Sequence, residues 1–184
     1  KINSKIFIKN KKIIKSFLIK KNFYPYLTNI LASVALISEF YDLNKIDEKL
    51  FYNFKIPSSR GDIAKVRLNN KVIYFKDESY NSNPLSLKFA VENFNKENHG
   101  DKYLILGDML ELGKFSKKLH KKMSKIINKT SIKKVYVIGK DIKETFYAID
   151  RKKRGRILKD KNEIYHLIKK DLNNNDHLMI KASL

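Results

Sequence analysis

From residue 63 onward, the sequence alternates short apolar runs with amphipathic segments. The apolar runs are rich in β-branched and aromatic residues, which is the pattern of buried strands. The segments between them repeat apolar residues along one helical face, as Leu87, Ala90, Val91 and Phe94 do. Strands that alternate with helices in this way predict an α/β fold with a doubly wound, mostly parallel sheet. Strands are expected at 63–68, 72–75, 103–106, 135–138, 157–158 and 177–180.

The first 57 residues do not show this alternation. Their apolar pieces predict a hairpin turning at Lys9–Lys12, a helix over Leu27–Tyr41 and a second short helix over Asp47–Phe54. The first of these helices is apolar nearly all round, so we expect it to be buried in a larger domain. A break rich in Pro, Ser and Gly follows at Ile56–Asp62. We therefore predict the remnant of one domain over residues 1–57 and a second domain, truncated at its end, over 58–184.

Composition excludes several classes of protein. The chain has 184 residues, of which 42% are hydrophobic, and no apolar run approaches the roughly 20 residues of a membrane span. It has no cysteine, which excludes disulfides, cysteine-ligated zinc and cysteine nucleophiles and fits a cytoplasmic protein. Neither a phosphate-binding Gly-rich loop nor a metal-ligand spacing of the histidines is present. His99, His166 and His177 are expected at the surface, whereas His120 follows a polar loop.

A net charge of +21 raises the question of nucleic-acid binding. Only five of the 40 basic residues are arginines, however, and the lysines are scattered along the chain. Arginine is the residue that reads bases by bidentate contacts, so no nucleic acid is expected as a partner. The densest cluster, Arg151–Arg156, is interpreted as a solvated loop rather than an RNA-binding patch. A basic, non-catalytic nucleic-acid-binding module remains the alternative from another class.

The stretch Asp77–Pro84 joins an expected strand to an expected helix and is almost entirely polar. Asn83 is placed to cap the helix, with Pro84 in its first turn. Similar polar loops follow other expected strands, at Gly107–Gly113, Gly139–Asp141 and Lys181–Ser183. Because the carboxyl ends of parallel strands share one edge, these loops are expected to meet where α/β proteins bind ligands. An ordinary polar connection is the alternative.

Two of these loops resemble motifs of the Mur ligase family. Asp77–Pro84 resembles the family's Asp-Asp-Ser-Tyr-Asn-Ala-Asn-Pro, and Leu106–Gly113 its Leu-Gly-Asp-Met-x-Glu-Leu-Gly, with His120 at the family's Leu-His position. Shorter segments are similar to the family's Gly-Arg-Gly link, its Lys-Gly-Ser and the helix that ends its central domain: Ser59–Gly61, Lys181–Ser183 and Pro25–Ala35. The five segments follow the family's order across nearly the whole chain.

The resemblance implies an ATP-dependent amide ligase that uses Mg²⁺ and an acyl-phosphate intermediate. Its substrates would be UDP-N-acetylmuramoyl-tripeptide and D-alanyl-D-alanine, joined in peptidoglycan synthesis by a monomeric enzyme. The phosphate loop and the UDP-binding domain would lie upstream, so the chain alone is expected to be inactive. A Mur-type ligase with another amino-acid acceptor, or one that makes folylpolyglutamate, remains an alternative.

The same resemblance assigns individual residues. Arg60 is the expected catalytic residue, clamping the ATP phosphates as the domain closes. Further contacts to ATP are expected from Asn29, Asp77 and Glu78. Substrate contacts are expected from Ser79, Tyr80, Asn81, Asn83, Asp108, Met109, Glu111, Gly113, His120, Lys181 and Ser183, with Lys181 pairing a terminal carboxylate.

The chain departs from the family pattern at three points. Pro25-Tyr26 stands where the family has His-Asn, Glu78 where it has a second Asp, and Ala182 where it has Gly. The Ala182 change would matter if that backbone required a positive φ. A divergent but active sequence and a degenerate, inactive copy would both explain these changes.

Overall fold

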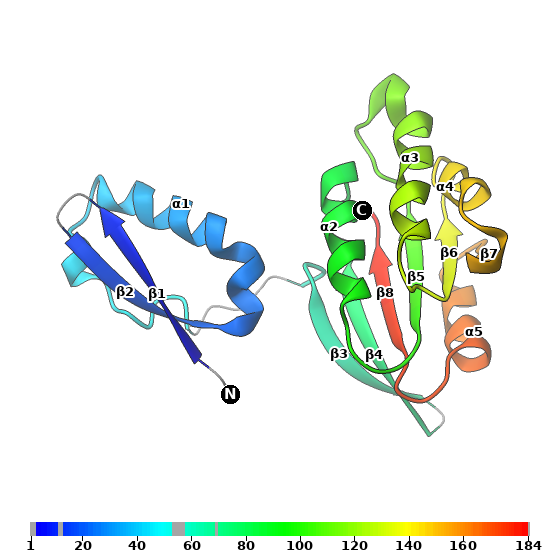
Figure 1. The fold of residues 1–184 in the computed structure, drawn as a ribbon, viewed down its shortest axis with the longest axis horizontal. Helices are drawn as coiled ribbons and strands as arrows, with labels where there is room; N and C mark the ends of the chain where they lie inside the picture. Colours follow the sequence, from blue (N-terminus) through cyan, green and yellow to red (C-terminus); the bar gives the residue numbers. More distant parts are fainter. Residues whose placement is uncertain (1–2, 11–12, 53–57, 69, 184) are drawn as a thin grey trace. The chain divides into compact units, whose positions relative to one another are not determined.

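The computed structural model describes residues 3–10, 13–52, 58–68 and 70–183. The chain divides into two compact units, residues 1–55 and residues 56–184 (Figure 1). The boundary expected after residue 57 stays a prediction, because residues 53–57 lie outside the described residues.

A β-hairpin and one α-helix make up most of the first unit. Its elements are β1 (Asn3–Asn10), β2 (Ile13–Lys20), the 3-10 helix η1 (Lys21–Tyr26), α1 (Leu27–Ser38) and the 3-10 helix η2 (Leu43–Lys45). The two strands pair antiparallel, and the inward side chains of β2, Phe17 and Ile19, are fully buried. The predicted hairpin is therefore confirmed, although residues 11 and 12 of its turn lie outside the described residues.

Two expectations for this unit were wrong. Helix α1 ends at Ser38 rather than Tyr41. Its Leu31 and Leu36 are exposed within the described unit, so burial of this helix in a larger domain stays a prediction. Residues 48–52 form turns instead of the expected helix over Asp47–Phe54, whose last two residues lie outside the described part. In place of a helical bond the Glu48 carbonyl accepts the Leu18 N–H at 2.8 Å, and the Tyr52 N–H donates to the Lys49 carbonyl at 2.9 Å, closing a turn.

The second unit is a six-stranded sheet with helices on both faces. Its strands are β3 (Asp62–Leu68), β4 (Lys71–Glu78), β5 (Lys102–Gly107), β6 (Lys134–Ile138), β7 (Arg154–Ile157) and β8 (His177–Lys181), in the spatial order β3-β4-β8-β5-β6-β7. Only β3 runs antiparallel to its neighbour. The predicted α/β fold with a mostly parallel sheet is confirmed, and the last strand in the chain, β8, lies at its centre.

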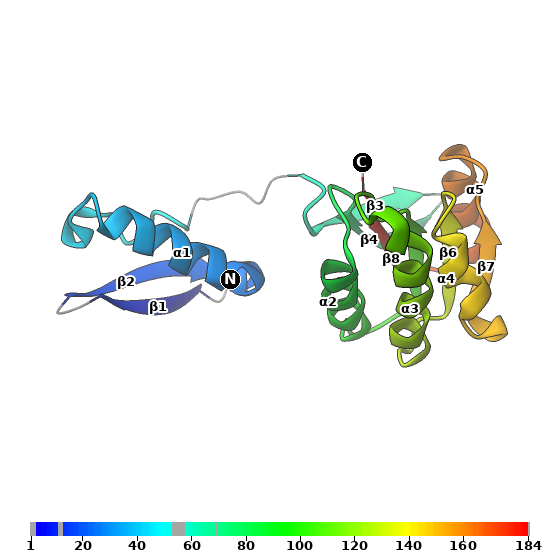
Figure 2. The same cartoon turned by 90° about the horizontal axis from the view of Figure 1, so that it is seen from above.

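The helices of this unit divide between the two faces of the sheet (Figure 2). They are α2 (Pro84–Asn95), α3 (Ser116–Asn128), α4 (Lys143–Ala148) and α5 (Asn162–Asp171). Phe94 of α2, Ile127 of α3 and Phe146 of α4 bury one face of the sheet in a single apolar cluster. A second cluster joins Leu167 of α5 to the opposite face. Burial on both faces explains why the central strands are continuous apolar runs.

The basic cluster Arg151–Arg156 corrects another expectation. It forms the 3-10 helix η4 (Arg151–Lys153) and the edge strand β7 rather than a solvated loop. Lys153 is buried and donates to the carbonyl oxygens of Thr130 and Ile132, and burial lowers its pKa. Arg154 donates to the Ile149 carbonyl oxygen at 3.0 Å. These cations therefore tie β7 to the rest of the unit instead of forming a free patch.

Within the described parts of the chain, no helix is both long and apolar enough to cross a membrane. His166 is exposed, as expected for a surface histidine. His177, by contrast, is the first residue of β8, as the expected strand at 177–180 predicts, and is half-buried rather than fully at the surface.

Candidate functional site

The four polar loops meet at the carboxyl edge of the sheet and are joined by hydrogen bonds. The residue that joins most of them is Ser183, which follows β8. Its hydroxyl accepts from the backbone N–H groups of Ser82 and Leu110, at 3.0 and 3.3 Å. Its own backbone N–H donates to the Asp108 carbonyl oxygen at 3.1 Å. The predicted convergence of these loops is therefore confirmed.

Asp77 and Glu78 are the last residues of β4, so the polar loop itself begins at Ser79. The Asp77 carboxylate accepts from the hydroxyls of Ser79 at 2.6 Å and Ser59 at 2.8 Å. Burial raises the pKa of Asp77, but these hydrogen bonds outweigh burial and leave the pKa below its ordinary value. Glu78 instead faces Lys76, with 3.7 Å between Oε1 and Nζ. The two neighbouring acids therefore have different partners: Asp77 binds two serine hydroxyls, and Glu78 lies near a lysine ammonium.

Asn83 caps helix α2, as the sequence predicts. Its side-chain oxygen accepts the Ser86 N–H at 2.8 Å, and the Ser86 hydroxyl accepts the Asn83 N–H at 3.0 Å. Pro84 stands in the first turn, where its missing N–H costs nothing. The reciprocal cap holds the start of the helix against the loop and engages the polar atoms of Asn83.

Arg60 lies against the polar loop. Its guanidinium carbon is 3.9 Å from the centre of the Tyr80 ring, which is a close cation–π contact. Two backbone hydrogen bonds hold the segment in place, from Tyr80 N–H to Ser59 O at 3.1 Å and from Gly61 N–H to Asp77 O at 2.7 Å. Ser59 and Gly61 both have positive φ, which turns the chain sharply on either side of Arg60. The arrangement places an exposed cation beside Asp77 and Glu78.

Asp108 has a structural task rather than an open carboxylate. Its two oxygens accept the N–H groups of Lys140 and Ile142, at 2.8 and 2.7 Å. Gly139 has a φ of +138°, and a Cβ there would lie 2.6 Å from the Asp108 carboxyl carbon. Because both carboxylate oxygens already accept backbone N–H groups, direct contact of Asp108 with substrate is not expected. The residue instead binds the loop after β6 to the loop after β5.

His120 and Met109 are both buried, with exposed fractions of 0% and 2%. The Met109 N–H donates to Nε2 of His120 at 2.9 Å, and the His120 Nδ1 donates to the Ser116 carbonyl oxygen at 2.8 Å. These two bonds require the neutral ring with its proton on Nδ1. Contact of either side chain with substrate stays a prediction. His120 anchors the loop after β5 from beneath.

Replacing His120 with alanine is expected to lower the free energy of unfolding by about 2–4 kcal/mol, because it leaves a cavity and an unpaired Met109 N–H. Urea unfolding measures the loss, and hydrogen exchange of the Met109 amide should become faster. Ser124→Ala on the same helix is the control, since it removes only a local bond to Lys121 O. An unfolding free energy within about 0.5 kcal/mol of the parent's would show that His120 does not hold the loop.

Lys181 also binds backbone groups of a neighbouring loop. It is 3% exposed, and its ammonium donates to the carbonyl oxygens of Glu78 and Asn81. Burial lowers the pKa of Lys181, and the Glu78 charge opposes that shift. The ammonium is therefore buried and already bound to two carbonyl groups, and its contact with a substrate carboxylate stays a prediction.

Other expected residues remain exposed at the same edge: Tyr80, Asn81, Glu111 and Gly113. Ser79 is half-buried beside them. Asn29 is exposed on α1, in the other unit. Ala182 does not have a positive φ, and its side chain fills the space that a Cβ on Gly107 would occupy. Sequence reasoning gave no role to Ser59 or Gly139. The signal for Ser59 was its place in the segment similar to the family's Gly-Arg-Gly link, and the signal for Gly139 was its place in a polar loop.

Comparison with known proteins agrees with this geometry. The profile of the family described as Mur ligase, glutamate ligase domain, matches residues 65–184. The UDP-N-acetylmuramoyl-tripeptide–D-alanyl-D-alanine ligase of Bacillus subtilis strain 168 is 28% identical over 159 residues, which cover 84% of this chain and 34% of the relative. The chain thus spans about a third of the length of the curated relatives it matches.

Solved structures share the fold. MurF from Acinetobacter baumannii matches with a TM-score of 0.77 at 17% identity, covering 98% of this chain and 40% of the other. MurF ligase from Thermotoga maritima in complex with ADP matches with a TM-score of 0.68 at 20% identity, covering 92% and 38%. At these identities the likeness establishes the fold. Together with the profile match over most of the second unit, it shows that the chain belongs to the Mur ligase family.

Proposed function

We propose that the chain is part of an ATP-dependent ligase that joins D-alanyl-D-alanine to UDP-N-acetylmuramoyl-tripeptide in peptidoglycan synthesis. The observation that carries the proposal is the contact of Arg60 with Tyr80 beside Glu78, at the edge where four loops converge. Arg60 and Tyr80 match the family's motifs, and Glu78 stands where the family has a second Asp. The names of the relatives from Bacillus subtilis and Rickettsia prowazekii support the same substrates.

The proposed reaction has two steps. The carboxylate of the tripeptide attacks the γ-phosphorus of ATP, ADP leaves, and an acyl phosphate forms. The amine of the dipeptide then attacks the acyl carbon, loses a proton, and phosphate leaves as the amide forms. Neither step needs a nucleophile from this chain, so the task of its residues is to position substrates and stabilise charge.

For ATP, we propose that Arg60 neutralises phosphate charge and that Glu78 accepts from the ribose hydroxyls. Glu78 suits this role better than Asp77, because each Asp77 oxygen already accepts from a serine hydroxyl. Asn29 is proposed to contribute from the first unit. The ADP complex of the Thermotoga maritima neighbour supports a nucleotide as ligand.

Mg²⁺ bound to ATP would neutralise further phosphate charge. Among the described residues no group of three or more histidine or acidic side chains is placed to hold a metal ion, so we assign Mg²⁺ no ligand from this chain.

For the peptide substrates, we propose contacts from residues that are accessible at the carboxyl edge. Ser79, Tyr80 and Asn81 would orient the tripeptide and the incoming dipeptide, and Glu111 and Gly113 would border the dipeptide. Ser183, Asp108, His120 and Lys181 would act through the loops that they connect. This division follows mainly from exposure, because Tyr80, Asn81, Glu111 and Gly113 are exposed whereas His120 and Lys181 are buried.

We propose that residues 1–57 are the end of the central ATPase domain and that residues 58–184 belong to the C-terminal domain. Leu31 and Leu36 support this assignment, because a helix with exposed leucines suits a larger domain that covers them. A monomeric, cytoplasmic enzyme is part of the same proposal.

The test is phosphate release by the complete gene product, given ATP, Mg²⁺ and the UDP-linked tripeptide, with and without D-alanyl-D-alanine. We expect release that depends on the dipeptide. The chain of residues 1–184 serves as a control and should release none, because its sequence contains no phosphate-binding loop. Absence of release from a folded complete protein would contradict the proposal and favour a degenerate copy.

A further inference from the structure

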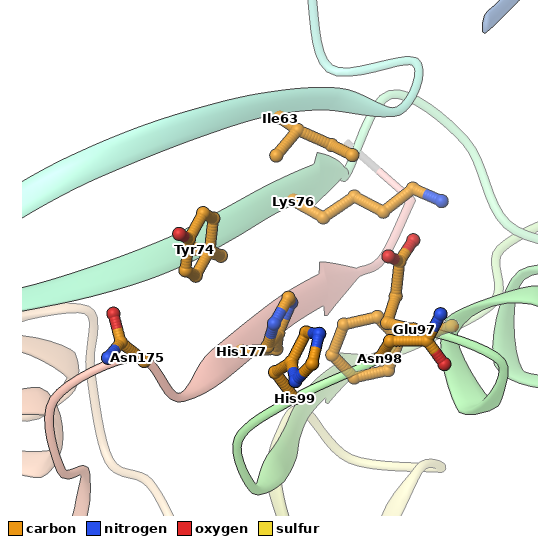
Figure 3. Close-up of a pocket in the computed structure, with 9 residues that line it drawn as sticks. Ile63, Tyr74, Lys76, Glu97, Asn98, His99, Asn175 and His177 are labelled. Carbon is orange, nitrogen blue, oxygen red and sulfur yellow. The ribbon is translucent and has the colours of Figure 1, made fainter. Parts of the chain in front are cut away.

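A cavity lies in the 56–184 unit, on the face of the sheet that α2 covers, apart from the loops at the carboxyl edge. Its volume is about 560 Å³, within the range of sites that hold small molecules. It is lined by the edge strand β3, its neighbour β4, the end of α2, the loop that follows and the start of β8 (Figure 3). It lies toward the amino end of β8 and therefore does not belong to the loops at the carboxyl edge. The lining residues are Ile63, Tyr74, Lys76, Phe94, Glu97, Asn98, His99, Asn175 and His177.

Aromatic side chains form one wall of this cavity. Tyr74 of β4 and His177 of β8 are partners in neighbouring strands, and their rings stack with 4.8 Å between centroids. Phe94, from the end of α2, meets His177 edge to face at 6.5 Å and is itself only 1% exposed, so it supports the wall from behind. Ile63 continues the apolar surface across β3 and is 60% exposed. A flat apolar group is the kind of ligand that such a wall accepts.

Opposite charges lie together at one end of the cavity. Figure 3 shows the Lys76 ammonium and the Glu97 carboxylate on the same side, away from Tyr74 and Asn175. The side chain of Lys76 is only 17% exposed, and its other charged neighbour is Glu78. Fixed charges of both signs at one end of an apolar cavity match a ligand that carries a positive and a negative group close together.

The remaining polar groups have free hydrogen-bonding capacity. Within the described residues, the side chains of Glu97, Asn98, His99, Asn175 and His177 and the Tyr74 hydroxyl make no hydrogen bond to protein. Burial lowers the pKa of His177, which leaves its ring neutral near pH 7 with one donor and one acceptor. Polar groups that converge on an apolar cavity without being used by the fold are the usual mark of a binding site.

We infer that this cavity binds a free aromatic α-amino acid. The ring lies against His177 and Ile63, the carboxylate pairs with Lys76, and the ammonium pairs with Glu97. An aromatic acid without the amine, or an amine without the acid, leaves one of the two charges unpaired and binds more weakly. The inference rests on the second unit alone and does not depend on the proposed ligase activity.

The first test is a titration of the chain of residues 1–184 with L-phenylalanine, followed by two-dimensional NMR. We expect saturable shifts at His177, Tyr74 and Glu97. The matched probes are 3-phenylpropionate, 2-phenylethylamine and L-alanine, each lacking one of the three recognised groups. Each should bind at least about tenfold more weakly. No saturable shift up to about 10 mM, or equal binding of L-alanine, would overturn the inference.

Variants provide the second test. Glu97→Gln and Lys76→Gln should each weaken L-phenylalanine binding by about tenfold or more. Glu92→Gln and Lys88→Gln are the matched controls, since these residues form an exposed pair on α2 outside the cavity. The NMR spectrum of each free variant verifies its fold. Affinity that is unchanged in Glu97→Gln and Lys76→Gln would assign the shifts to binding elsewhere and overturn the inference.

Discussion

Arg60→Ala in the complete ligase is expected to lower kcat by about 10²-fold or more. The proposed role of Arg60 is to neutralise charge that develops as the γ-phosphate is transferred, and loss of one such contact has effects of this size. The side chain is exposed and stacks on Tyr80, so its removal should leave the fold intact. Steady-state phosphate release, measured beside a urea unfolding curve, separates the catalytic loss from any structural one.

Two further variants sharpen this test. Arg67→Ala is the matched control, because Arg67 is an exposed arginine on β3 outside the site. Its kcat should stay close to that of the parent. Arg60→Lys keeps the charge without the planar group that stacks on Tyr80, so partial recovery is expected. An unchanged rate in Arg60→Ala would remove this residue from the site.

Gly139→Ala is expected to destabilise the second unit by about 2–4 kcal/mol. At a φ of +138° an alanine is strained, and its Cβ would lie 2.6–2.7 Å from the Asp108 carboxylate. Relief of that clash requires Asp108 to release the N–H groups of Lys140 and Ile142. Urea unfolding of the chain of residues 1–184, followed by far-UV circular dichroism, measures the loss.

Gly113→Ala is the control for conformation alone. Gly113 also has a positive φ, of +52°, but no described atom lies within 4 Å of a Cβ built there. Its cost should therefore be only about 1 kcal/mol, the ordinary cost of a left-handed alanine. Equal losses in the two variants would mean that backbone strain, and not the contact with Asp108, explains the need for glycine at position 139.

Most of the second unit could be predicted from the sequence because its signals are local. The apolar run Leu104–Leu106 and the helical face Leu87–Phe94 each specify their element without reference to the rest of the chain. Convergence of the loops then follows from the shared carboxyl edge of parallel strands. The position of β8 between β4 and β5 could not be predicted in this way, since strand order depends on packing between distant segments.

The roles of individual polar residues were harder to predict. Asp108, His120 and Lys181 lie in or near loops, and in a sequence such residues are indistinguishable from ligand contacts. The structure uses them to hold backbone N–H and carbonyl groups of neighbouring loops. A buried polar group must find a partner, and which backbone group is nearby depends on the tertiary fold. Arg60 and Tyr80 lie 20 positions apart, so their contact also required the structure.

The first unit shows the same limit in secondary structure. Asp47–Phe54 has the composition of a helix, yet the carbonyl of Glu48 is taken by the N–H of Leu18 in the hairpin. Propensity over a short segment is a weak signal that one tertiary hydrogen bond can override. The basic cluster Arg151–Arg156 is similar, because Lys153 becomes buried only through carbonyl groups supplied by the turn before β6.

The proposal that the complete protein joins D-alanyl-D-alanine to the UDP-linked tripeptide is tested most directly by identifying which amine it adds. The complete protein is given ATP, Mg²⁺ and the UDP-linked tripeptide with an equimolar mixture of D-alanyl-D-alanine, D-alanine, L-lysine and L-glutamate, and the product is weighed by mass spectrometry. The account predicts a single product that has gained one D-alanyl-D-alanine less one water. A product that has gained a single amino acid, with none carrying the dipeptide, would contradict it and place the chain in a different Mur ligase.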